Sequence, residues 1–298
     1  MAGAAKAKTV KGRNHRLAIL GRYLVLSLIG LVFVFPIVFM IISSFKPNLQ
    51  LLRDTSSLRA FLPVGDISLR NYYEAFERAP IGLFIFNSVF ITGITVALGL
   101  FLNSLAGFAF AILKWPGKNI ILSIIIATLI IPFETIAIPL LMVVNFLPWI
   151  GPEGFTQGWL DSRHVQIIPF IADALSIFLF TQFFRDLPKE MVEASRIDGA
   201  TWWQVYLRVL VPISGPVFAT AAILKFLAMY NQFLWPLMVA QSEENRPVLV
   251  GLQYFFQLNV EWGEIMAYLT IITVPVLIFY LALQRAFIES IASSGVKG

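Results

Sequence analysis

The sequence predicts an all-α membrane protein with six transmembrane helices and one structured cytoplasmic loop. Three observations predict this class: the composition, the long uncharged runs, and the distribution of basic residues. Of the 298 residues, 58% are hydrophobic and 13% are charged. Soluble domains average about 45 to 50% apolar and about 25% charged residues. A water-soluble core of ordinary size does not bury such an apolar excess, so we expect the chain to lie in a membrane.

Six stretches with few or no charged residues define the expected spans, since a bilayer requires roughly 20 apolar residues per helix. Arg22 and Lys46 bracket the first uncharged run, and Arg78 and Lys114 bracket the second. We place the spans at about 22–45, 84–113, 120–147, 167–184, 216–239 and 265–284. These lie in one transmembrane domain, residues 17–288, between two cytoplasmic tails. The tail at 1–16 is basic and expected to be disordered near lipid headgroups, and the other tail is 289–298.

The basic residues assign the two sides of the membrane, because cytoplasmic loops carry an excess of Lys and Arg. With six spans, both termini lie on the same side. That side has fourteen basic and five acidic residues, whereas the other has seven basic and ten acidic residues. The first side is therefore predicted to be cytoplasmic. The net charge of +5 is then a matter of topology, and no nucleic-acid partner is expected.

Several chemistries are excluded by the residues that are missing. Without cysteine there is no disulfide, Cys-ligated metal or thiol nucleophile. The two histidines, His15 and His164, each lie next to an arginine, which makes a histidine metal site improbable. The chain has no GxxxxGK[ST], HExxH or GxSxG sequence, so we expect no catalytic residue, nucleotide site or cofactor in it. One enzymatic alternative is an intramembrane carboxylate site built from Glu134 and Asp173.

The cytoplasmic loop at 185–212 has the signals of two short helices joined at a glycine. Pro188 suits a first helical turn, and Gly199 can adopt the left-handed conformation that ends a helix. Thr201 and Gln204 have capping-box spacing for the second helix. The simplest alternative is a well-capped surface hairpin without further function.

The same loop resembles a known motif. The residues that carry the resemblance are Glu193, Ala194, Ser195, Asp198, Gly199, Ala200 and the Leu-Val-Pro ending at Pro212. They resemble the EAA motif of binding-protein-dependent ABC importer permeases. Ser195 replaces the second alanine of that motif and keeps its small volume.

Residues outside the loop resemble the maltose-type carbohydrate branch of that family, in the smaller permease of the pair. They are the stretch 178–184, Phe226, Asn231, Phe233, Trp235, Pro236, Leu237, PVLVGLQYFF from Pro247, and the terminal Gly295, Val296, Lys297 and Gly298. Tyr230 replaces a usual tryptophan, and Thr181 stands where a basic residue is common. These two departures weaken any transfer of substrate identity.

The resemblance implies a machine and a role for this chain. It implies a prokaryotic inner-membrane permease that forms, with a second homologous permease, the pathway for a sugar, oligosaccharide or sugar-like solute. An extracytoplasmic binding protein delivers the solute, and two partner ATPases bind ATP and Mg²⁺. The loop is expected to dock into a groove on the ATPase. Glu193 would then meet basic or backbone donors, Gly199 would allow the turn, and Ala194, Ser195 and Ala200 would allow close approach.

Ionisable and polar residues within the spans are the candidates for lining the pathway, because a charge at the bilayer centre is costly. Pro132 and Pro139 lack the N–H of the helix ladder, so both are expected to break span three around Glu134. The candidates for contacting solute are Glu134, Asn231, Phe233 and Trp235. Alternatively, Glu134 snorkels to the interface and the aromatic residues only pack.

The sequence leaves the environments of two ionisable residues and two alternative functions undecided. Asp173 is expected to cap a helix at the interface, whereas Lys225 either forms an ion pair within the bundle or reaches the surface. An importer of the same class for a polyamine or phosphonate is compatible with the loop. An ion-coupled secondary transporter would use Glu134 or Asp173 as its coupling carboxylate and would require inverted repeats, which the sequence lacks.

Overall fold

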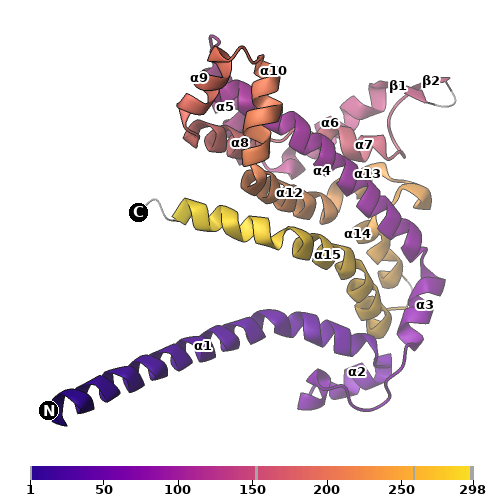
Figure 1. Ribbon diagram of the computed structural model, residues 1–298. Helices are drawn as coiled ribbons and strands as arrows, with labels where there is room; N and C mark the ends of the chain where they lie inside the picture. Colours follow the sequence, from indigo (N-terminus) through magenta and orange to yellow (C-terminus); the bar gives the residue numbers. More distant parts are fainter. Residues whose placement is uncertain (1, 152–153, 258, 296–298) are drawn as a thin grey trace. The chain divides into compact units, whose positions relative to one another are not determined.

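The computed structural model describes residues 2–151, 154–257 and 259–295. Its described part is helical except for one two-stranded hairpin (Figure 1). The chain forms two compact units, Met1–Arg78 with Leu258–Ile271, and Ala79–Gln257 with Ile272–Gly298. The last helix, α15 (Trp262–Gly295), contributes its start to the first unit and its remainder to the second. The predicted all-α class is therefore confirmed.

The first unit begins with the long helix α1 (Ala2–Ser44). The tail at 1–16 was expected to be disordered, but α1 begins at Ala2. The tail is rich in Ala and Lys, which favour helix. After α1 come α2 (Asn48–Asp54), η1 (Leu58–Phe61) and α3 (Arg70–Arg78). At the other end of the chain, α15 continues to Gly295, whereas Val296, Lys297 and Gly298 lie outside the described residues.

A fully buried lysine holds the turn after α1 in place. The Lys46 ammonium donates to the Asp54 carboxylate at 3.2 Å and to the Arg59 carbonyl at 2.6 Å. The Asn71 side chain donates to the carbonyls of Ser44 and Lys46, both at 2.8 Å. Burial tends to raise the pKa of Asp54, but the hydrogen bond and charge of Lys46 more than offset this, and the pKa is lowered. These bonds satisfy polar groups that the end of an apolar helix would otherwise leave buried without partners.

The second unit is organised around α4 (Ile81–Ala111), which packs against α8 (Ala174–Asp186) and α12 (Gly215–Tyr230). α4 and α8 lie close together where Gly107 faces the backbone of α8. A Cβ at Gly107 would lie 2.5 Å from the Cβ of Phe180 and 3.0 Å from the nitrogen of Thr181. The glycine therefore permits a helix contact that no larger residue allows, the packing role expected of small residues in membrane helices.

Three segments of this unit consist of helices joined across a sharp bend. α5 (Lys118–Ala127) with η2 (Thr128–Ile130) meets α6 (Phe133–Phe146) at 106°. α7 (His164–Ile167) with η3 (Ile168–Phe170) meets α8 at 40°. α10 (Trp202–Gln204), the π-helical η4 (Val205–Leu210) and α11 (Val211–Ile213) meet α12 at 80°. That last bend, at Ser214, separates the expected loop from the expected fifth span.

The stretch expected as span five contains an interruption. α12 ends at Tyr230, and α13 (Leu234–Val239) follows after three residues. Beyond it the chain forms η5 (Glu243–Asn245), α14 (Val248–Gly251) and η6 (Leu252–Phe256). α9 (Lys189–Ile197) lies between α8 and α10. By length and composition, three helices of the described residues are able to cross a membrane, or up to six if each bent pair forms one span.

Sequence patterns did not indicate the hairpin. Strands β1 (Pro148–Gly151) and β2 (Gly154–Gln157) pair antiparallel, with Trp149 opposite Thr156 and Ile150 opposite Phe155. Ile150 is 78% exposed. Two four-residue strands are too short for a clear alternation of apolar and polar residues, which is why the sequence did not predict them.

Replacing Gly107 by alanine is expected to destabilise the second unit. The added methyl group must push against the backbone of α8, and overpacking of this kind costs about 1–3 kcal/mol. Gly93→Ala is the matched control, since it lies in the same helix and an added Cβ there meets nothing within 4 Å. The midpoint of thermal unfolding of the purified protein in detergent should fall for Gly107→Ala and not for Gly93→Ala. Equal midpoints for the two variants would contradict the close contact.

Candidate functional site

The expected loop forms two helical segments joined by a left-handed glycine. α9 ends at Ile197, and Gly199 has φ = +84°. The N–H of Gly199 donates to the Arg196 carbonyl at 3.1 Å, and that of Ala200 donates to the Ser195 carbonyl at 3.0 Å. Since L-residues rarely adopt this backbone conformation, a glycine is favoured at the point where the chain turns.

The second helical segment begins with the capping box that the sequence predicts. The Gln204 N–H donates to the Thr201 hydroxyl at 3.3 Å, and the Thr201 N–H donates to the Gln204 side-chain oxygen at 2.7 Å. The two bonds satisfy donors that a helix start leaves free. The π-helical η4 follows directly, and the sequence pattern gave no indication of it.

The loop is fixed to the ends of the long helices by a hydrophobic cluster. Its buried members are Phe108, Phe180, Phe184, Val192, Val205, Tyr206, Leu210, Val217 and Ala221. Val192 is the member from α9, and its burial contributes about 1.5–3 kcal/mol. The hydroxyls of Tyr206 and Ser104 are 2.7 Å apart, which joins η4 to α4. α9 is thereby connected through packed side chains to α4, α8 and α12.

The motif residues mostly face outward. Glu193, Ala194, Asp198 and Gly199 are exposed, and the Ser195 hydroxyl donates to the Met191 carbonyl at 2.7 Å. The serine is thus satisfied within its own helix. Beside them the apolar side chain of Ile197 is 85% exposed. The tip of the loop therefore presents small residues and one large apolar side chain without cover from the described part of the chain.

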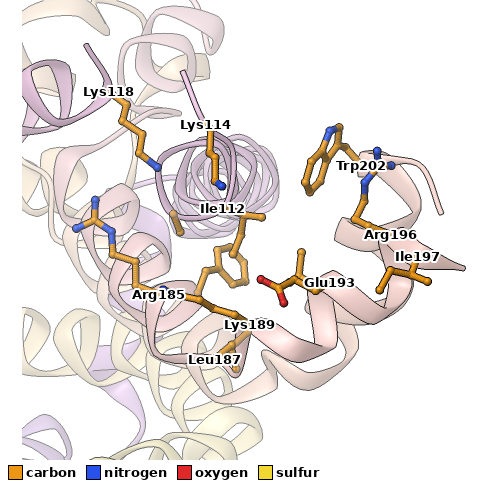
Figure 2. A pocket seen from close by; sticks show the side chains of 13 residues that line it. Ile112, Lys114, Lys118, Arg185, Leu187, Lys189, Glu193, Arg196, Ile197 and Trp202 are labelled. Carbon is orange, nitrogen blue, oxygen red and sulfur yellow. The ribbon is translucent and has the colours of Figure 1, made fainter. Parts of the chain in front are cut away.

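A pocket of about 900 Å³ lies between α9 and the ends of α4 and α8. We call it the basic pocket; it is lined by Ala111, Ile112, Lys114, Lys118, Phe184, Arg185, Leu187, Lys189, Val192, Glu193, Arg196, Ile197 and Trp202. In Figure 2, Lys114, Lys118 and Arg185 stand on one side, and Trp202 stands on the other. The Arg196 guanidinium lies 4.5 Å from the centre of the Trp202 ring and also donates to the Ala200 carbonyl.

Two breaks were expected around Glu134, and the structure has one of them. Pro132 forms the start of α6 with extended backbone, φ −61° and ψ 139°, at the 106° bend. Pro139 instead lies inside α6, which continues to Phe146. The expected second break is therefore wrong, because α6 continues through Pro139 although the proline removes one ladder hydrogen bond. Glu134 is exposed in the first turn of α6, where a carboxylate suits the helix dipole.

The residues expected to contact solute in span five have different environments. Asn231 and Phe233 are exposed at the interruption between α12 and α13. Trp235 has no exposed surface, and its indole N–H donates to the Val165 carbonyl at 2.9 Å. Its ring packs edge-on against Phe133 and Phe170. The structure therefore places Trp235 in the core, where it offers no face to a solute.

Asp173 and Lys225 form an ion pair that the sequence left undecided. The Lys225 ammonium donates to the Asp173 carboxylate at 2.6 Å and to the Phe170 carbonyl at 2.8 Å. Asn103 donates to the same carboxylate at 3.1 Å, and Asp173 caps α8 by accepting from the Ser176 N–H at 2.7 Å. A Cβ at Gly99 would lie 2.2 Å from Lys225 Cε. The cluster connects α4, α8 and α12 at the start of α8.

A second polar cluster orders the segment after α13. The Asp161 carboxylate accepts from the N–H and the hydroxyl of Ser242 at 2.8 and 2.9 Å and from Asn245 at 3.2 Å. Burial tends to raise the pKa of Asp161, but these hydrogen bonds lower it overall. Asn87 donates to the carbonyl of Glu244 at 2.8 Å. Hydrogen bonds thus hold the first part of the 241–264 segment against α4 and against the residues before α7.

Within residues 2–151, 154–257 and 259–295, no group of three or more His, Cys, Asp or Glu side chains is able to hold a metal ion.

Comparison with known proteins places these features in context. Residues 96–293 match the model of the family described as binding-protein-dependent transport system inner membrane component. The chain is 32% identical over 272 residues to the arabinooligosaccharides transport system permease protein AraQ of Halalkalibacterium halodurans, covering 91% of this chain and 93% of that protein. It is 30% identical over 283 residues to the lactose transport system permease protein LacG of Rhizobium radiobacter, covering 94% and 97%.

A solved structure supports the fold. A chain of a bacterial ABC transporter involved in the import of the acidic polysaccharide alginate matches with a TM-score of 0.75 at 20% identity, covering 92% of this chain and 98% of that one.

Proposed function

The chain belongs to the family of binding-protein-dependent transport system inner membrane components, and from this premise we propose that it is the permease subunit of an ATP-driven carbohydrate importer. The relatives named for arabinooligosaccharide and lactose transport support a sugar or oligosaccharide as the solute. The chain is a multi-pass membrane protein. Its proposed location is a prokaryotic inner membrane with both termini cytoplasmic.

The observation that carries the proposal is the construction of the loop. α9 is followed by the left-handed Gly199, packs inward through Val192 and exposes Ile197. A short helix held in this way moves with the helices to which it is packed, so a push on its exposed face tilts them. We propose that this face docks on a partner ATPase. ATP and Mg²⁺ are bound by that partner, and this chain holds neither.

The proposed pathway lies between this chain and a second homologous permease. Glu134, Asn231 and Phe233 are exposed where helices are interrupted, and interrupted helices at membrane depth occur where they line a cavity or are buried in protein. Phe233 supplies a flat apolar face and Asn231 supplies an amide, the two kinds of contact that a sugar needs. An extracytoplasmic binding protein would deliver the solute.

Replacing Ile197 by glutamate is expected to weaken docking at least tenfold, because a carboxylate in an apolar contact must be desolvated without a partner. The chain, carrying a tag, would be purified from its native membrane in mild detergent, and the co-purifying ATPase measured. Ile150→Glu, at a similarly exposed apolar side chain of β1, is the control and should retain the ATPase. Equal recovery of ATPase with both variants would argue against α9 as the docking element, and absence of any ATPase from the unaltered chain would argue against the importer.

A further inference from the structure

The lining of the basic pocket carries an excess of positive charge. The proposed docking of Ile197 on the ATPase does not explain this excess. The lining contains five basic side chains, Lys114, Lys118, Arg185, Lys189 and Arg196, and one carboxylate, Glu193. Figure 2 shows the Glu193 carboxylate directed into the pocket. One carboxylate cannot neutralise five cations, so the pocket has a positive potential that favours an anion.

Within the described part of the chain, two of the five cations have a hydrogen-bond or cation–π partner. Lys118 donates to the Leu113 carbonyl at 2.8 Å, and Arg196 is held by Trp202 and the Ala200 carbonyl. Among the residues that the structure describes, no hydrogen bond or ion pair engages Lys114, Arg185 or Lys189. The general excess of basic residues on the cytoplasmic side explains why these side chains are positively charged. It does not explain why they surround a hollow of about 900 Å³ rather than spread over the surface.

The rest of the pocket wall is apolar and continues into an apolar helix face. Ile112, Leu187 and Val192 contribute to the wall. α5 begins at Lys118, and its next turns expose Ile120 by 69%, Ile121 by 44% and Ile124 by 61%. A cationic pocket that continues into an exposed apolar face is complementary to an anionic phospholipid, whose phosphate headgroup is followed by apolar acyl chains.

We propose that the basic pocket binds the phosphate headgroup of an anionic phospholipid of the cytoplasmic leaflet, whose acyl chains lie along the exposed isoleucines of α5. Arg185 and Lys189 would hold the phosphate together with Lys114, because Arg and Lys donate charge-assisted hydrogen bonds to phosphate oxygens. Such a lipid would link α9 to the ends of α4 and α8 and restrain the loop. Only the cytoplasmic placement of the loop rests on the proposed function.

Native mass spectrometry of the purified protein, with whatever subunits accompany it, tests the proposal. The protein in detergent would be titrated with phosphatidylglycerol in the presence of excess phosphatidylcholine, and the retained lipids counted. Arg185→Gln with Lys189→Gln is expected to lower phosphatidylglycerol retention roughly thirtyfold, since each basic residue near anionic lipid contributes about 1 kcal/mol. Arg53→Gln with Arg59→Gln removes two exposed charges from the segment predicted to be external and should leave retention unchanged.

A charge-conserving variant keeps the test informative if the glutamine pair folds poorly. Arg185→Lys with Lys189→Arg retains both charges and should retain the lipid. Equal phosphatidylglycerol retention by the glutamine pair and the unaltered protein would overturn the proposal. If the glutamine pair lost the co-purifying ATPase but retained phosphatidylglycerol, the proposal would also be overturned, because Arg185 and Lys189 would then bind the partner subunit.

Discussion

Replacing Gly199 by valine is expected to reduce transport at least tenfold while membrane insertion and ATP hydrolysis by the partner subunits persist. Gly199 has φ = +84°, and an added Cβ would meet nothing within 4 Å. The effect must therefore come from the backbone. An L-residue in the left-handed region costs roughly 1–2 kcal/mol, and a β-branched side chain is a particular outlier there. The loop would relieve this strain by turning differently, which would change the direction of α9 relative to α10.

The measurement compares uptake of the solute and ATP hydrolysis in proteoliposomes that contain the complete transporter. Gly154→Val is the matched control, because Gly154 has φ = +96° and equally open space but lies at the start of β2. That variant carries a similar backbone strain outside the loop and should transport normally. Normal transport by Gly199→Val, or an equal loss in both variants, would contradict a coupling role for the turn.

Replacing Asp173 by alanine is expected to destabilise the protein more than replacing Lys225 by methionine. The Lys225 side chain is 5% exposed, whereas the Asp173 side chain is 34% exposed. Removing Asp173 leaves a buried ammonium with one carbonyl partner, and loss of one member of a buried pair costs about 3–5 kcal/mol. It also removes the cap of α8. Removing Lys225 leaves a carboxylate that retains its bonds with Asn103 and the Ser176 N–H and is not buried.

Thermal unfolding of the purified protein in detergent measures this asymmetry. The double variant Asp173→Ala with Lys225→Met should be more stable than Asp173→Ala alone, because it no longer buries an unpaired charge. A double-mutant cycle gives the coupling between the two residues, which contacting pairs show and distant pairs lack. Additive effects, or a larger loss for Lys225→Met, would contradict the ion pair as described.

Local signals in the sequence were sufficient for the loop but not for the contacts between helices. The turn at Gly199 and the capping box of Thr201 and Gln204 depend on residues close in sequence, so their spacing predicted their geometry. The pairing of Asp173 with Lys225 joins residues 52 positions apart. Sequence reasoning identified both as costly charges in apolar spans but could not tell whether Lys225 pairs or reaches the surface.

The candidates for the pathway show the same limit. Pro132 breaks its span as predicted, because a proline pushes the preceding residue out of helical geometry, and Ile131 is extended. A helix break at Pro139 and a solute contact at Trp235 were predicted from residue type alone. α6 continues through Pro139. Tertiary packing buries Trp235, whose indole N–H donates to the Val165 carbonyl. The hairpin had no pattern long enough to predict.

Cross-linking from position 197 tests the proposed coupling most directly. The chain contains no cysteine, so Ile197→Cys introduces a unique thiol at the exposed tip of α9. A thiol-reactive photocross-linker would be attached in native membranes, the product identified by mass spectrometry, and Ile150→Cys treated in parallel. The proposed coupling predicts a covalent adduct between position 197 and an ATP-hydrolysing subunit, and none from position 150. An adduct with the ATPase from position 150 but not from position 197, or no ATPase adduct at all, would contradict it.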